Sequence, residues 1–165
     1  MITPTWRFVL SNPVNFMAFG LGTGLSPKAP GTVGTLVGYP LYFLLISYLS
    51  FNYVLIVLTT LYLLGIWICD VAGKAVGVSD HSGIVWDEIV AMALVLCFSP
   101  QNIYGYVGAF LAFRLFDIVK PWPINLIDKK MENGHGVMLD DLLAAGYSIV
   151  LIQVVVYFYP QYQSI

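Results

Sequence analysis

Two adjacent carboxylic acids, Asp87 and Glu88, lie inside an apolar stretch that extends from Gly83 to Ser99. An ionised carboxylate at membrane depth costs about 2.5 to 3.5 kcal/mol unless it is paired or hydrated. Neither a helix cap nor a solvated helix face accounts for two acids at this position. The pair therefore favours a functional site in which a strong partner compensates both charges.

The remaining acids fall near the ends of apolar stretches, where several segments could bring them to one layer. They are Asp70, Asp80, Asp117, Asp128, Glu132, Asp140 and Asp141. Carboxylates without clustered imidazoles or thiolates favour a hard cation, and Mg2+ typically joins one or two carboxylates to substrate phosphate oxygens. The acids therefore predict an Mg2+ site.

Four of these acids also have an ordinary structural alternative. Asp140 or Asp141 could cap the last helix, and Asp80 could be a cap or turn residue. Asp117 could form an i,i+3 ion pair with Arg114. These alternatives are open for the single residues, whereas Asp87 and Glu88 have none of comparable weight.

The segment from Gly20 to Thr35 is rich in glycine and offers hydroxyl groups and one cation. These side chains are Thr23, Ser26, Lys28 and Thr32. Together with backbone N–H groups they could bind a phosphate, but the segment matches neither a P-loop nor a dinucleotide fingerprint. Close helix packing or a chain reversal explains the glycines equally well.

Two further cations, Arg114 and Lys120, flank Asp117. Arginine is suited to bidentate phosphate binding and lysine acts as a point charge. Their alternative role is to neutralise the acids around them.

The composition places the chain in a membrane. Hydrophobic residues make up 59% and charged residues 10% of 165 residues, and the mean hydropathy is +0.82; a soluble domain has about 25% charged residues. A chain of this length fits one bundle, so we expect a single domain over residues 1–165. The net charge of -2 does not suggest nucleic-acid binding.

Five apolar runs predict an all-α, polytopic bundle of about five spans. The runs cover residues 36–50, 53–69, 83–99, 103–119 and 142–159. Residues 13–35 are rich in Gly, Pro, Ser and Thr, so we expect a re-entrant or surface loop there.

The charges of the connections predict the orientation. The connections 51–52 and 100–102 and the segment after residue 159 carry no charge, whereas the opposite set holds Arg7, Lys28, Lys74, Lys120, Lys129 and Lys130. By the positive-inside rule this second face is cytoplasmic. We therefore expect the N-terminus inside, the C-terminus outside and the acids near the inner face.

Four segments, taken in order, resemble the signatures of the phosphatidylglycerophosphatase A family. They are GTGLSPKAPGTVGT (22–35), DHSGIVWDEIV (80–90), FRLFDIVKPWPI (113–124) and GHGVMLDDLLAAG (134–146). Four ordered motifs are far more specific than one glycine-rich loop, and with the span pattern they cover most of the chain.

The resemblance implies a membrane-embedded, Mg2+-dependent phosphatase of the bacterial inner membrane. It would convert phosphatidylglycerophosphate to phosphatidylglycerol and inorganic phosphate at the cytoplasmic face. On this basis we assign Mg2+ binding to Asp80, Glu88, Asp117 and Asp141, catalysis to Asp87, Glu88 and Asp140, and phosphate binding to Thr23, Ser26, Lys28, Thr32, Arg114 and Lys120.

Two questions stay open at this stage. Direct attack by water, activated by Asp87 or Asp140, is preferred over a covalent aspartyl-phosphate. A transporter or ion-conducting bundle is the alternative function, because intramembrane acids also mark ion pathways. It predicts acids throughout the bilayer depth.

Overall fold

The computed structural model describes residues 2–131 and 133–159, and within these residues all regular structure is helical. Glu132 lies outside the described residues. In chain order the helices are α1 (Trp6–Leu10), α2 (Pro13–Ala18), the 3-10 helix η1 (Gly20–Leu25), α3 (Pro30–Tyr48), α4 (Phe51–Val76), α5 (Trp86–Cys97), α6 (Ile103–Val119), α7 (Ile124–Lys130) and α8 (Gly134–Phe158).

Three of these helices, α3, α4 and α8, are long and apolar enough to cross a membrane. Large apolar side chains such as Ile56 and Val150 are exposed on them, as expected where lipid covers the surface. Helix α6 has 17 residues and α5 only 12; at 1.5 Å per residue α5 is about 18 Å long, less than the hydrocarbon core. The count of five spans stays a prediction.

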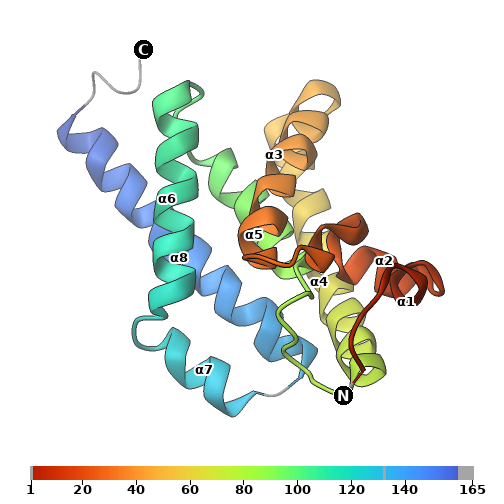
Figure 1. The fold of residues 1–165 in the computed structure, drawn as a ribbon. Coiled ribbons are helices and arrows are strands. Elements are labelled where there is room, and N and C mark those ends of the chain that lie inside the picture. The colour runs from red at the N-terminus through yellow and green to blue at the C-terminus, as the bar shows by residue number, and fades with distance from the viewer. Residues whose placement is uncertain (1, 132, 160–165) are drawn as a thin grey trace.

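Helix α5 lies at the centre of the bundle and begins partway along its length (Figure 1). It packs against α3, α4, α6 and α8, and most of its residues are buried. A helix that is apolar on every side requires such a position. The first turn of α5, which carries Asp87 and Glu88, is therefore held inside the protein.

The prediction of a loop over residues 13–35 was wrong for much of the segment. Helices α2 and α3 begin at Pro13 and Pro30, and proline is favoured at the first helical position because its missing N–H is not needed there. Between them, η1 contains Leu21 and Gly22 with positive φ. In this segment the prolines begin helices, and the residues with positive φ bend the chain between them.

The last helix begins eight residues before the predicted start at residue 142. Its N-cap is Asn133, whose side chain accepts a hydrogen bond from the Gly136 N–H. Asp140 and Asp141 consequently lie in the second turn of α8 and are buried. The N-cap alternative for these two acids is excluded.

Candidate functional site

Side chains from five segments line one polar cavity of about 400 Å3. The segments are the start of α3, the connection before α5, the first turn of α5, the end of α6 and the second turn of α8. The lining residues are Ala29, Pro30, Gly31, Asp80, Ser82, Ile84, Asp87, Glu88, Arg114, Asp117, Ile118, Lys120, Asp140 and Asp141. All six acids predicted for the site therefore meet, together with both of the cations that flank Asp117.

Arg114 joins two of the acids across the interface of α5 and α6. Its Nη1 lies 2.9 Å from Glu88 Oε1 and 2.6 Å from Asp117 Oδ2, and it donates to Thr35 Oγ1 at 3.3 Å. The i,i+3 ion pair that was the structural alternative for Asp117 is present, and Glu88 is an additional partner of Arg114. These side chains are only 12 to 15% exposed, so their charges compensate each other away from bulk water.

Lys120 likewise joins two acids, on the other side of the cavity. Its Nζ lies 2.5 Å from Asp128 Oδ1 and 2.7 Å from Asp140 Oδ2. Burial lowers the pKa of Lys120, but hydrogen bonds to both carboxylates outweigh burial and raise that pKa above its usual value. The residue follows the end of α6 with φ 43° and links α6 to α7 and α8.

Three carboxylate oxygens of the cavity residues are buried without a hydrogen-bond partner. They are Asp87 Oδ1, Glu88 Oε2 and Asp141 Oδ2. An unsatisfied buried acceptor costs about 1 to 3 kcal/mol, more when it is charged. Such oxygens are acceptors that a proton, a water molecule or a cation can satisfy.

The donor set fits Mg2+ in type. In the described part of the chain, no three His, Cys, Asp or Glu side chains are arranged to hold one metal ion. Mg2+, however, commonly uses one or two carboxylates and completes its shell with water and substrate phosphate oxygens. The unpaired oxygens of Glu88 and Asp141 are suited to that mode of binding.

Two glycines of α3 allow Glu88 to reach its position. A Cβ added at Gly31 would overlap the Glu88 carboxylate, and one at Gly34 would lie 2.9 Å from Glu88 Oε2 and 2.5 Å from Val85 Cβ. Sequence reasoning noted the glycines as possible packing residues but did not identify this contact. Their spacing of three, on one helix face, was the available signal.

The four side chains of the glycine-rich segment that were predicted to bind phosphate do not line the cavity. Thr23 Oγ1 donates to the Gly20 carbonyl at 2.7 Å and Ser26 Oγ to the Lys28 carbonyl at 2.9 Å. Lys28 is exposed, and neither it nor Thr32 lines the cavity. The phosphate-binding role of these four residues stays a prediction.

The backbone at the start of α3 contributes to the wall instead, through residues 29–31. The N–H groups at the start of a helix lack acceptors within the helix and attract anions. This helix has 19 residues, and its first turn faces the same cavity as the two cations. The site thus contains three elements that favour a phosphate group.

His81 supports the connection that carries Asp80 and Ser82. Its Nδ1 accepts a hydrogen bond from the Gly83 N–H at 3.0 Å, and its ring packs against Phe19. Burial lowers the pKa of His81, which agrees with a neutral ring that accepts at Nδ1. We assign His81 a structural role.

Comparison with known proteins gives a consistent result. The family model of phosphatidylglycerophosphatase A matches residues 16–156. Phosphatidylglycerophosphatase A from Haemophilus influenzae is 41% identical over 155 residues, covering 93% of this chain and 95% of the relative. Phosphatidylglycerophosphatase A from Escherichia coli is 36% identical over 155 residues, covering 93% and 90%.

A third relative, from Bacteroides thetaiotaomicron, is 40% identical over 145 residues, covering 82% of this chain and 88% of the relative; its name assigns it provisionally to the phosphatidylinositol-3-phosphatases. No solved structure was found to match. The family match includes every residue that lines the cavity. The chain therefore belongs to the phosphatidylglycerophosphatase A family.

Proposed function

We propose that this lipid phosphatase hydrolyses the terminal phosphate of phosphatidylglycerophosphate, releasing phosphatidylglycerol and inorganic phosphate. The observation that carries the proposal is the convergence of six acids, Arg114 and Lys120 in one cavity, in a chain of this family. A phosphomonoester needs cations and N–H groups for its oxygens and a base for water. The cavity supplies both.

Phosphate binding falls to the two cations and the start of α3. Arg114 can offer further N–H donors, because its Nε is buried without a partner. Lys120 has three donors, two of which bind Asp128 and Asp140. The substrate phosphate would bind between these cations and the first turn of α3.

Asp87 is the residue best suited to activate water. It is 8% exposed and its Oδ1 has no partner, whereas Asp140 is already bound to Lys120. Asp87 would accept a proton as the water oxygen bonds to phosphorus. The bond from phosphorus to the glycerol oxygen breaks, that oxygen takes a proton from solvent water, and Asp87 returns its proton to solvent.

Transfer to an aspartate is the rival mechanism. Single turnover in 18O-labelled water distinguishes the two, because direct attack places the label in the released phosphate and leaves the protein unlabelled. Label found on an aspartate after the turnover would contradict direct attack.

We further propose that Mg2+ participates, held by carboxylates among Asp80, Glu88, Asp117 and Asp141. When bound, Mg2+ would neutralise charge on the phosphate oxygens. The unpaired oxygens of Glu88 and Asp141 support this assignment. Asp117 would be a weaker ligand, because its Oδ2 is already paired with Arg114.

We propose the cytoplasmic face of the bacterial inner membrane as the location of the cavity. The exposed cations Lys129 and Lys130 lie in α7, at the end of the bundle where α6 ends and α8 begins (Figure 1). The positive-inside rule favours the cytoplasm for this end. The clustering of the acids there favours an enzyme over a transporter.

Phosphate release from phosphatidylglycerophosphate in detergent micelles tests the function, with Mg2+ and then with excess EDTA. We expect release with Mg2+ and its loss with EDTA. Phosphatidylinositol 3-phosphate is the comparison substrate, because one relative carries that name. Glu88→Gln should fold and lose turnover; full activity in that variant would contradict the site, and activity indifferent to EDTA would contradict the metal.

A further inference from the structure

A second, mostly apolar pocket of about 310 Å3 lies between α4, α5 and α8. Its wall on α5 consists of Asp87, Val90, Ala91 and Leu94, which follow the i, i+3, i+4, i+7 spacing of one helix face. Leu58 of α4 also lines it. The pocket therefore follows α5 away from the polar cavity for about 10 Å, at 1.5 Å per residue.

Asp87 lines both the polar cavity and this pocket. Among the described residues it is the only one that the two linings share, and it lies in the first turn of α5. The two spaces therefore meet at the carboxylate that we assign to water activation. A molecule with a phosphate at one end and a hydrocarbon chain at the other fits a polar cavity that adjoins an apolar pocket.

The pocket also has access from the lipid side. Thr59 and Leu63 line it and are exposed on α4. The Thr59 hydroxyl donates to the Leu55 carbonyl of its own helix at 2.8 Å, so it does not present a free polar group to a chain. Hydrocarbon from the bilayer can therefore reach the pocket without crossing water.

We infer that this pocket binds one acyl chain of the phospholipid substrate and so orients the phosphate in the polar cavity beyond Asp87. The inference rests on the proposed function and adds a specificity site to it. An acyl chain runs from the headgroup layer toward the bilayer centre, which is the direction of the pocket from Asp87 to Leu94. Selection for long acyl chains follows, because each buried methylene adds binding energy.

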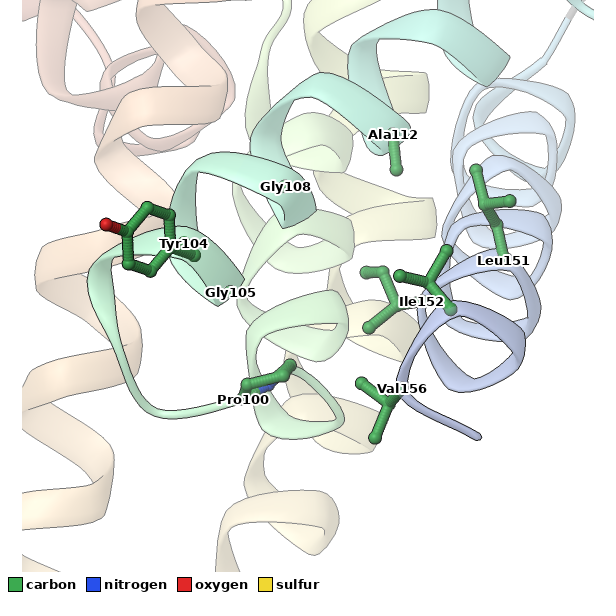
Figure 2. A pocket seen from close by; sticks show the side chains of 9 residues that line it. Pro100, Tyr104, Gly105, Gly108, Ala112, Leu151, Ile152 and Val156 are labelled. Atoms are coloured by element: carbon green, nitrogen blue, oxygen red, sulfur yellow. The ribbon is translucent and has the colours of Figure 1, made fainter. Parts of the chain in front are cut away.

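The chain offers a matched control in another apolar pocket, of about 260 Å3, between α6 and α8. Figure 2 shows Gly108 and Ala112 on one side of it and Leu151, Ile152 and Val156 on the other. It shares no lining residue with the polar cavity. Ala112 and Ala91 are similarly buried, at 7% and 4% exposure.

The experiment compares Ala91→Phe with Ala112→Phe, using phosphatidylglycerophosphate with long and with six-carbon acyl chains. In Ala91→Phe we expect KM for the long-chain lipid to rise about tenfold or more, the effect of displacing roughly two methylenes. The six-carbon lipid should keep its KM, and Ala112→Phe should resemble the wild type with both. Leu94→Trp, seven residues from Asp87, should repeat the selective loss.

The outcomes separate the two proposals. The acyl-chain site would be overturned if Leu94→Trp raised KM equally for both chain lengths. It would also be overturned if neither Ala91→Phe nor Leu94→Trp raised KM for the long-chain lipid. In both cases phosphate release by the wild type would still uphold the phosphatase. A wild type that releases no phosphate from either lipid would overturn the proposed function and this inference with it.

Discussion

The carboxylate of Glu88 packs directly on the backbone of Gly31, so closely that a methyl group at position 31 would overlap it. Glu88 comes from the central helix α5 and Gly31 from the first turn of α3. The acid reaches its partner Arg114 only because the neighbouring helix has no side chain there. A glycine thus determines where a charged group lies.

Gly31→Ala should therefore displace Glu88 and reduce turnover strongly while the helices stay folded. Gly108→Ala is the control, because a Cβ at Gly108 meets nothing within 4 Å and alanine favours a helix over glycine by about 1 kcal/mol. Phosphate release and thermal unfolding in detergent measure the two effects. Wild-type turnover in Gly31→Ala would show that the position of Glu88 is not critical.

Arg114→Ala should destabilise the protein, because Glu88 and Asp117 would lose the cation that they share. Removing one member of a buried ion pair costs about 3 to 5 kcal/mol. Arg114→Lys should recover part of this stability but less of the activity, since an ammonium lacks the planar arrangement of donors.

The matched control for Arg114 is Lys74→Ala. Lys74 pairs with Asp70 at 2.6 Å but is 76% exposed, and exposed pairs contribute less than about 1 kcal/mol. Equilibrium unfolding in mixed micelles gives both values. Equal destabilisation by the two alanine variants would contradict the buried role of Arg114.

Asp87→Asn should lower kcat by about 100-fold to 10,000-fold, the usual contribution of a general base. The amide has nearly the same shape and removes a buried carboxylate, so the folded state should be at least as stable as the wild type. Single-turnover rates with saturating lipid measure the chemical step. A near-normal kcat in this variant would show that another acid is the base, and Asp140 would be the next candidate.

The predicted orientation can be tested with single cysteines in a chain that lacks Cys69 and Cys97. Gln101 precedes the start of α6 and Lys129 lies in α7, and both are exposed. The start of α6 and helix α7 lie at opposite ends of the bundle (Figure 1). A membrane-impermeant maleimide added to intact spheroplasts should label Gln101→Cys at once and Lys129→Cys only after permeabilisation. The reverse pattern would place the polar cavity at the outer face.

The sequence predicted the acid site more completely than the helix boundaries. Asp87 and Glu88 could be identified because charge inside an apolar run has few explanations. The start of α8 was missed because Gly134 and Gly136 resemble a loop, although added Cβ atoms there would overlap the carbonyls of Ile66 and Met131. The contact of Gly134 with Ile66 of α4 joins residues far apart in the sequence. A local pattern does not contain such a contact, so the need for glycine there could not be distinguished from a loop.

The segment predicted to bind phosphate also shows where prediction from the sequence fails. Thr23 and Ser26 have suitable side chains, but nearby carbonyl groups bind their hydroxyls. Nothing in the spacing indicates that competition. The pairing of Lys120 with both Asp128 and Asp140 was equally hidden, since it depends on how α7 returns the chain to α8.

Both cations of the cavity are already occupied by the protein's own carboxylates, Arg114 by two and Lys120 by two. Those carboxylates compete with any incoming phosphate, and they are ready to replace a departing one. In the protein without substrate, these carboxylates thus occupy the cations that would bind the phosphate product. The ion pairs would trade some tightness of substrate binding for rapid clearance of inorganic phosphate after each turnover.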